Sequence, residues 1–252
     1  HGSRLWTTTG LWHAAAHDQL CSVLIMQEIL SYRLSDLLLF SEQSYLRQFE
    51  LYNNWLSSTQ WLVYLYGILF LFSLLSPERY FTRVLFLASS AFWLICSYGF
   101  LWQFYASINW MAEYFIVLFI IQSMVILWAG LMRYPSTKLK PRSNFFKLGL
   151  LLWVATLLVQ PVTEFLTGRT WSQLSIFALT PDSLSFMAVA FMLILRLPVM
   201  LFLPAGLWLL FSSLTYLAMD SITAFFPAFA LVIYLVSIFL QPSSLKKVSG
   251  RK

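Results

Sequence analysis

The stretch that decides the fold runs from residue 109 to residue 147, NWMAEYFIVLFIIQSMVILWAGLM followed by RYPSTKLKPRSNFFK. Its first part is almost entirely apolar and long enough for a helix to cross the roughly 30 Å hydrocarbon core of a bilayer. Its second part carries Arg133, Lys138, Lys140, Arg142 and Lys147. An apolar run that stops at a cluster of Lys and Arg is typical of a membrane-spanning helix that ends on the cytoplasmic side.

The composition extends this interpretation to most of the chain. Its residues are 60% hydrophobic and 10% charged, against roughly 45–50% and 25% in an ordinary soluble domain. A soluble protein of 252 residues could not enclose that much apolar surface in one core, so we expect lipid to surround most of it. The net charge of +6 comes from short loops between apolar runs, which indicates membrane topology rather than a nucleic-acid partner.

Seven apolar runs predict an all-α, polytopic transmembrane bundle with seven spans. They lie near residues 57–76, 81–103, 109–132, 145–166, 182–196, 198–218 and 222–241. The fifth is the shortest, because Arg196 and the following Leu197-Pro198 interrupt it. As a helix it would be about 22 Å long, which leaves open whether it crosses the bilayer fully.

The distribution of basic residues predicts an outer N-terminus and a cytoplasmic C-terminus. With seven spans, the 133–147 loop, Arg79, Arg83, Arg196 and the basic tail all lie on one side. A six-span topology without the fifth helix would place the basic tail outside, against the positive-inside rule. We therefore expect a multi-pass protein of a bacterial inner membrane, with the lipid bilayer as its first partner.

The N-terminal part is expected to lie outside this bundle. Residues 1–25 are predicted to be an upstream or non-native extension, because Met26-Gln27-Glu28 forms a suitable start. Ser41 can cap a helix that begins at Glu42, and the apolar side chains that follow mark a rough helical stripe. The predicted divisions are the 1–25 extension, a 26–56 amphipathic interfacial segment, the 57–241 bundle and a 242–252 basic cytoplasmic tail.

Four carboxylates gather at the outer ends of the predicted spans: Glu113, Glu164, Asp182 and Asp220. An ionisable group inside a span is costly and usually faces the bundle interior or a wet cavity. They could form an acidic, outward-facing vestibule that binds a cation or relays protons. Alternatively, Glu113 and Glu164 reach the headgroups, Asp182 favours the first turn of its helix, and Asp220 caps the seventh span.

Asn109 and Trp110, at the entry to the third span, have the same two interpretations. Asn109 is a good helix cap and Trp110 an interfacial anchor, or both line a site.

Other chemistry is not predicted. His13, His17 and Cys21 have helical spacing but no evident fourth ligand, so no metal or other cofactor is expected. The last span contains no Lys for a retinal Schiff base. Phosphate-binding glycine loops, HExxH and GxSxG are absent from the sequence, and we do not expect an enzyme.

Three strings resemble an uncharacterised bacterial family of multi-pass membrane proteins, domain of unknown function 6064. They are residues 34–53 (LSDLLLFS, then Tyr45 and FELYN), residues 105–115 (YASINW, then Ala112 and Tyr114-Phe115) and residues 171–182 (Trp171, Gln173, Phe177 and LTPD). Ala178 and Ser183 depart from the Gly and Pro of that pattern. The resemblance covers about residues 29–240. It implies a membrane protein, with members sometimes described as permeases, and draws attention to outer-face Asp36, Glu50, Asn109 and Asp182.

These observations support one leading function and two alternatives. The leading hypothesis is a small transporter or permease for an ion or small solute. The first alternative is a non-transporting accessory or assembly subunit, with a membrane-protein partner or a second copy of the chain. A weaker alternative is a membrane-embedded enzyme that acts on lipid, since paired carboxylates can serve acid–base roles.

Overall fold

A computed structural model describes residues 38, 40–75, 79–133 and 143–240, with backbone alone at 79–82 and 132–133. The chain divides into two compact units, His1–Leu38 and Leu39–Lys252, and the second is described below. The extension, Asp36, His13, His17, Cys21, the middle of the basic loop and the basic tail lie outside the described residues.

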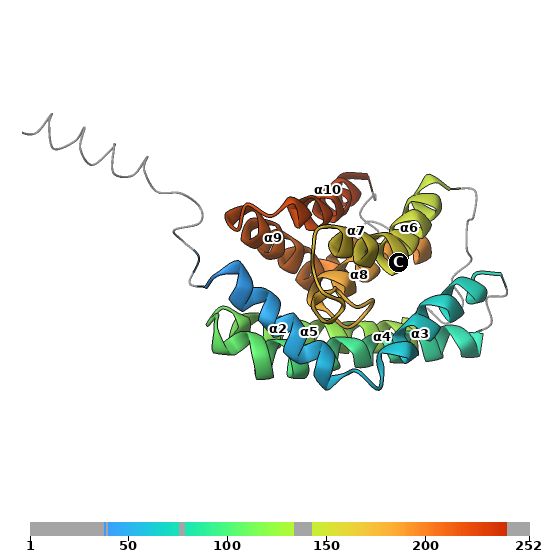
Figure 1. Ribbon diagram of the computed structural model, residues 1–252. Coiled ribbons are helices and arrows are strands. Elements are labelled where there is room, and N and C mark those ends of the chain that lie inside the picture. Colours follow the sequence, from blue (N-terminus) through green and yellow to red (C-terminus); the bar gives the residue numbers. More distant parts are fainter. Residues whose placement is uncertain (1–37, 39, 76–78, 134–142, 241–252) are drawn as a thin grey trace, which may run out of the picture. The chain divides into compact units, whose positions relative to one another are not determined.

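All elements of the described part are helices, and they follow the predicted apolar runs closely (Figure 1). Here η denotes a 3-10 or π-helical turn. In chain order they are α2 (Glu42–Trp55), α3 (Gln60–Ser73), α4 (Arg79–Ile95), η2 (Cys96–Phe104), η3 (Tyr105–Ser107), α5 (Ala112–Trp128), η4 (Ala129–Arg133), α6 (Asn144–Val154), η5 (Ala155–Val159), α7 (Gln160–Leu166), η6 (Trp171–Gln173), α8 (Pro181–Leu195), η7 (Val199–Phe202), α9 (Leu203–Ala218), η8 (Ile222–Ala224) and α10 (Phe225–Leu240).

Five continuous helices of the described part are long and apolar enough to cross a membrane. They are Arg83–Ser107, Ala112–Leu131, Asn144–Leu166, Val199–Ala218 and Ile222–Leu240. The bent pair of α2 and α3 could form a sixth span, and α8 is apolar but shorter. The helices therefore lie where the sequence predicted them, while the count of seven crossings and their orientation stay predictions.

The first predicted helix begins where expected. The Ser41 hydroxyl accepts a hydrogen bond from the Ser44 backbone N–H at 3.2 Å, which satisfies a donor in the first turn of α2. Tyr45, Phe49 and Tyr52 form the buried stripe of this helix. An 88° bend then separates α2 from α3, so α2 runs across the direction of the next helix rather than along it.

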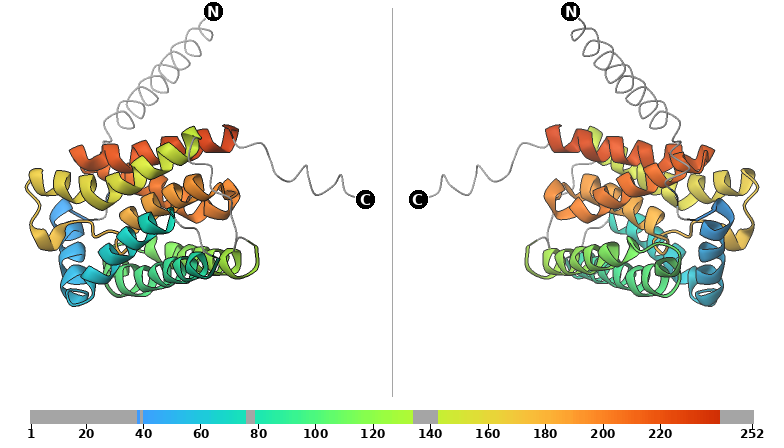
Figure 2. Two further views of the ribbon diagram at one scale, coloured as in Figure 1. Left: turned by 90° about the vertical axis from the view of Figure 1, so that its right-hand side faces the viewer. Right: turned by 90° about the vertical axis from the view of Figure 1, so that its left-hand side faces the viewer.

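Helix α8 is enclosed on all sides, since each of its residues from Pro181 to Leu195 is buried. Figure 2 shows α8 and α9 (orange) between α10 (red) on one side and α4 and α5 (green) on the other. The Phe191 ring packs against Phe70 of α3 and Phe86 of α4, with ring centroids 5.5 and 4.8 Å apart. Gly149 lets α6 approach closely, because a Cβ there would lie 2.9 Å from the Ala190 carbonyl oxygen.

The long helix Asn144–Leu166 changes geometry in its middle, where η5 is a π-helical turn. Pro161 follows this turn after one residue, Gln160. A proline lacks an N–H and its ring clashes with the carbonyl four residues earlier, here that of Leu157. The wider π turn accommodates this clash, and the helix continues as α7 with Gln160 and Glu164 turned into the interior.

Candidate functional site

Three charged side chains are buried among the residues that the structure describes. Their exposed fractions are 2% for Glu164, 6% for Arg169 and 1% for Asp182. Glu164 lies in the last turns of α7, Arg169 in the loop that follows, and Asp182 in the first turn of α8. All three therefore belong to the same end of the helical body, where α9 also ends and α10 begins.

Asp182 accepts three hydrogen bonds from one face of α9. Its Oδ1 atom accepts from Trp208 Nε1 at 2.8 Å and from Ser212 Oγ at 2.6 Å, and its Oδ2 atom accepts from Tyr216 Oη at 3.0 Å. The three donors are spaced four residues apart, so they lie along one side of the helix. Ser212 lies about 9 Å before the end of α9, at 1.5 Å per residue, which places the carboxylate inside the bundle.

Glu164 joins α7 to the loop that leads to α8. Its Oε2 atom accepts a 2.6 Å hydrogen bond from the Ser175 backbone N–H, and its Oε1 atom accepts one of 3.2 Å from Gln160 Nε2. Arg169 Nη1 lies 3.5 Å from Glu164 Oε2, in a buried ion pair. Helix α7 ends at Leu166, and Gly168 follows it with a φ of 95°, the left-handed conformation that often terminates a helix.

Arg169 connects this ion pair to α9 and to the short turn η8. Its Nη2 atom donates to Thr223 Oγ1 at 3.0 Å, and its guanidinium lies 5.4 Å from the centre of the Tyr216 ring. Burial lowers the pKa of the Arg169 guanidinium, but Tyr216 and Glu164 beside it outweigh that effect and raise the pKa above its ordinary value. Arg169 is therefore a permanent cation, and Tyr216 contacts both it and Asp182.

The charges of this network do not balance when both carboxylates are ionised. Glu164 has an ion pair with Arg169, whereas the hydrogen-bond donors to Asp182 are all neutral side chains. Two carboxylates thus share one buried guanidinium. A proton on one carboxyl group or a bound cation would complete the balance.

The structure brings two of the four predicted outer carboxylates together and leaves the other two apart. Glu164 and Asp182 belong to the buried network, whereas Glu113 is exposed in the first turn of α5. Asp220 is also exposed, and the prediction that it caps the seventh span is wrong. It has a φ of 52° and follows the end of α9, while Ser221 precedes η8. The predicted acidic vestibule of four carboxylates is replaced by an enclosed network of two.

The remaining predicted site residues have structural or surface positions. Asn109 is buried, donates to Tyr105 Oη at 2.9 Å and accepts from the Met111 N–H at 3.0 Å. It is not the cap of α5, because Met111 is the residue that immediately precedes this helix. Trp110 is exposed, and Glu50 forms a surface ion pair with Arg47 at 2.6 Å. Among the described residues no group of three or more His, Cys, Asp or Glu side chains could hold a metal ion.

Four residues of the network were missed from the sequence: Arg169, Trp208, Ser212 and Tyr216. Two signals point to them. Arg169 is a basic residue in a predicted outer loop, against the charge asymmetry of the chain. The polar atoms of the other three recur every four residues within an apolar helix, and such residues usually face a partner inside the bundle.

Comparison with known protein families identifies the chain. The model of a family of unknown function, DUF6064, matches residues 42–245. The chain belongs to this family. A search of curated proteins and a search of solved structures each find no match to this DUF6064 protein.

The three strings that carry the family resemblance converge on the network. Asn53 Nδ2 donates to the carbonyl oxygens of Ser172 and Leu174, at 2.8 and 2.9 Å. Tyr45 packs its ring against Tyr105 and Tyr216, with centroids 5.7 and 5.6 Å apart. Helix α2, the entry to α5 and the loop before α8 therefore meet over Asp182 in this DUF6064 protein.

The departure from the family pattern at residue 178 has a structural meaning. Ala178 has a φ of 57°, in the left-handed region that favours glycine, and it is fully buried. The Gly expected from the resemblance would adopt this conformation without strain. The second departure, Ser183, uses its hydroxyl to donate to the Ile176 carbonyl oxygen at 2.6 Å, which holds the same loop against α8.

Proposed function

We propose that this DUF6064 protein is a transporter for a small solute or ion that couples transport to proton exchange at Asp182. In this proposal the chain crosses a bacterial inner membrane seven times, with its C-terminus in the cytoplasm, and it catalyses no covalent reaction. The observation that carries the proposal is the full burial of Asp182 among three neutral donors, next to a carboxylate that already pairs with the buried guanidinium.

The geometry supports proton exchange in a simple way. When a proton binds Asp182, that carboxyl oxygen becomes a donor, and the Ser212 or Tyr216 hydroxyl can turn to accept it. The Trp208 N–H cannot turn in this manner, because an indole is a donor only, so it keeps the carboxyl group in place. Release of the proton restores the three hydrogen bonds, so the charge of the network rises by one unit when the proton binds and falls by one unit when it leaves.

The cover over the network supports alternating access. Asn53 and Tyr52 of α2 hold the loop before α8 through hydrogen bonds to its carbonyl oxygens, including that of Leu179 at 3.2 Å. Both elements would have to move for Asp182 to meet the solution at this end of the bundle. We take the present arrangement as an occluded state of the proposed cycle.

Reconstituted vesicles provide the test. The purified protein is placed in liposomes that contain a pH-sensitive dye, and internal pH is followed after addition of each member of a panel of ions and small solutes. We expect wild type to show solute-dependent proton movement, Asp182→Asn to abolish it, and the exposed-residue control Glu113→Gln to retain it.

Equal proton movement in wild type and Asp182→Asn would overturn the proposal, as would background signal for wild type across the panel. Background signal together with a stoichiometric co-purifying membrane protein would favour the accessory-subunit alternative.

A further inference from the structure

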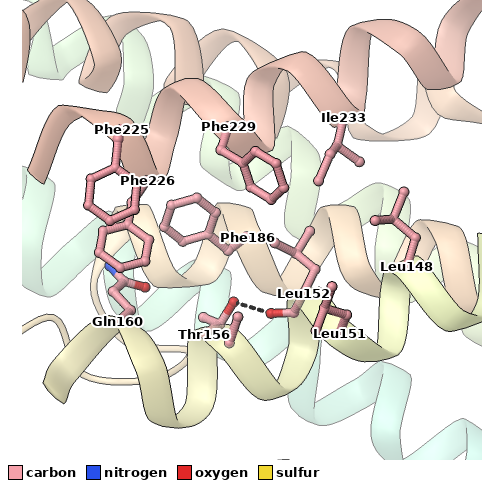
Figure 3. Close-up of a pocket in the computed structure, with 11 residues that line it drawn as sticks. Leu148, Leu151, Leu152, Thr156, Gln160, Phe186, Phe225, Phe226, Phe229 and Ile233 are labelled. Carbon is pink, nitrogen blue, oxygen red and sulfur yellow. Dashed lines mark hydrogen bonds between the residues drawn. The ribbon is translucent and has the colours of Figure 1, made fainter. Parts of the chain in front are cut away.

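A groove separates α10 from α6, η5 and α7 on the opposite side of the body from α4 and α5. Its volume is about 450 Å³. Figure 3 shows side chains of α10 facing those of α6 and η5 across the gap, with Phe186 of α8 between the two rows. The lining residues are Leu148, Leu151, Leu152, Ala155, Thr156, Gln160, Phe186, Phe225, Phe226, Phe229 and Ile233.

The walls of this groove suit hydrocarbon and not water. Nine of its lining side chains are apolar, and the Thr156 hydroxyl already donates to the Leu152 carbonyl oxygen at 2.7 Å. A water molecule needs two to four polar partners, which these walls do not offer along most of their length. An empty gap would forfeit dispersion contacts on both walls, so a flexible apolar chain is the occupant that the groove favours.

The length of the groove matches one leaflet of a bilayer. From Leu148 to Gln160 the helix rises about 18 Å, at 1.5 Å per residue. The hydrocarbon of a single leaflet is about 15 Å deep, half of the roughly 30 Å core. An acyl chain of a membrane lipid laid along the groove would therefore run from one end of the lining to the other.

One end of the groove carries a polar atom without a partner. Gln160 is 2% exposed, and its Nε2 atom donates to Glu164 while its Oε1 atom has no hydrogen-bond partner. A buried acceptor left unpaired costs free energy, so the occupant is expected to bring a donor to it. In Figure 3 the Gln160 amide lies below Phe225 and Phe226, at the opposite end from Leu148 and Ile233.

We propose that this groove binds one acyl chain of a phospholipid whose headgroup donates a hydrogen bond to Gln160 Oε1. The chain lies between α6 and α10, over Phe186 of α8, and the headgroup lies at the α7 end. This inference depends on the apolar helices lying in a bilayer and not on the proposed transport, so either proposal can fail alone.

Photoactivatable lipids test this site. The protein is reconstituted with phosphatidylethanolamine that carries a diazirine in one acyl chain, irradiated, and digested for mass spectrometry. We expect adducts to concentrate on residues 148–156 and 225–233. Adducts spread evenly over lipid-facing positions such as Val117 and Met124 of α5, which are 57% and 61% exposed, would overturn the proposal without any variant.

A filling variant and a matched control sharpen the result. Ala155→Phe places a ring in the groove, whereas Leu158→Phe introduces the same aromatic residue at a position of η5 that is outside the lining and 57% exposed. We expect Ala155→Phe to reduce adducts in the groove by about tenfold, since two or more chain methylenes lose their contacts. Leu158→Phe should retain them, and equal labelling of the two variants would overturn the proposal.

Two further experiments test which headgroup the site prefers and whether the acyl chain belongs to a phospholipid or to a free fatty acid. Phosphatidylcholine with the same photoactivatable chain lacks a headgroup donor and should label the groove less than phosphatidylethanolamine. Equal labelling by the two lipids would overturn the assigned contact with Gln160. A free fatty acid with the same diazirine should not displace the phospholipid, and full displacement would overturn the choice of occupant.

Discussion

The Tyr216 hydroxyl lies 3.0 Å from Asp182 Oδ2, although 34 residues separate them in the chain. The ring of the same tyrosine lies beneath the Arg169 guanidinium. One side chain thus contacts both the carboxylate that lacks an ion pair and the buried cation. Because Tyr216 lies between them, a change in the charge of Asp182 would alter the electrostatic potential at the Arg169 guanidinium.

Adjacent serines of α9 should differ sharply in their contribution to stability. Ser212→Ala removes a donor to the buried Asp182 carboxylate and should lower the free energy of unfolding by about 1.5–3 kcal/mol. Ser213→Ala removes only a hydrogen bond to the Leu209 carbonyl oxygen within the helix and should cost less than about 1 kcal/mol. Denaturant titration of both purified variants measures the difference. Equal losses would show that Ser212 does not stabilise an ionised carboxylate.

The Arg169–Glu164 pair should behave as a buried ion pair whose partners depend on each other. Arg169→Met leaves Glu164 without its cation and should destabilise the protein by about 3–5 kcal/mol. Adding Glu164→Gln to that variant should recover part of the loss, because the uncompensated charge is gone. Arg47→Met breaks an exposed pair with Glu50 and should cost at most about 1 kcal/mol.

Thermal unfolding of these four proteins supplies the measurement. A double variant less stable than Arg169→Met would contradict the buried pair.

Residue 178 should tolerate glycine better than an ordinary buried alanine does. At a φ of 57°, Ala178→Gly relieves about 1–2 kcal/mol of left-handed strain, which offsets the lost methyl group and the extra chain entropy. The net change should lie within about 1 kcal/mol of zero. Ala188→Gly, in the middle of α8, has no strain to relieve and should cost about 2 kcal/mol. Similar losses for both variants would mean that Ala178 is not strained.

The proposed topology places the loop before α8 and the end of α8 on opposite sides of the membrane. Trp171 is 74% exposed in that loop, and Arg196 is exposed at the C-terminal end of α8. In intact spheroplasts, a membrane-impermeant maleimide should label Trp171→Cys but should label Arg196→Cys only after permeabilisation. The unsubstituted chain gives the background from its own cysteines. The reverse pattern would invert the predicted orientation, and labelling of both would contradict a full crossing by α8.

The positions of the helices could be predicted from the sequence, but their rotations could not. Apolar runs and breaks such as Leu197-Pro198 depend on local composition, so the predicted run 145–166 closely matches Asn144–Leu166 of the structure. Whether Glu113 or Glu164 faces the interior depends on how each helix is turned against its neighbours. An apolar helix in lipid has little amphipathic pattern to reveal which of its faces is buried.

The candidate site was half predicted for the same reason. Asp182 and Glu164 attract attention because carboxylates are rare in apolar runs. The basic charge of Arg169 in a predicted outer loop is unusual for this chain, but no local sequence feature shows that this loop folds inward. The 88° bend between α2 and α3 falls at the boundary predicted between the 26–56 interfacial segment and the first span.

The enclosure of α8 has a consequence for biogenesis. A helix of 15 residues that is buried on all faces gains its neighbours from both earlier and later parts of the chain, since α6 precedes it and α9 and α10 follow. At about 22 Å, α8 is shorter than the roughly 30 Å hydrocarbon core of a bilayer. In the proposed seven-span topology, we therefore expect α8 to take its final position only after α9 has been made and supplies the donors for Asp182. Its placement would then depend on the chain that follows it.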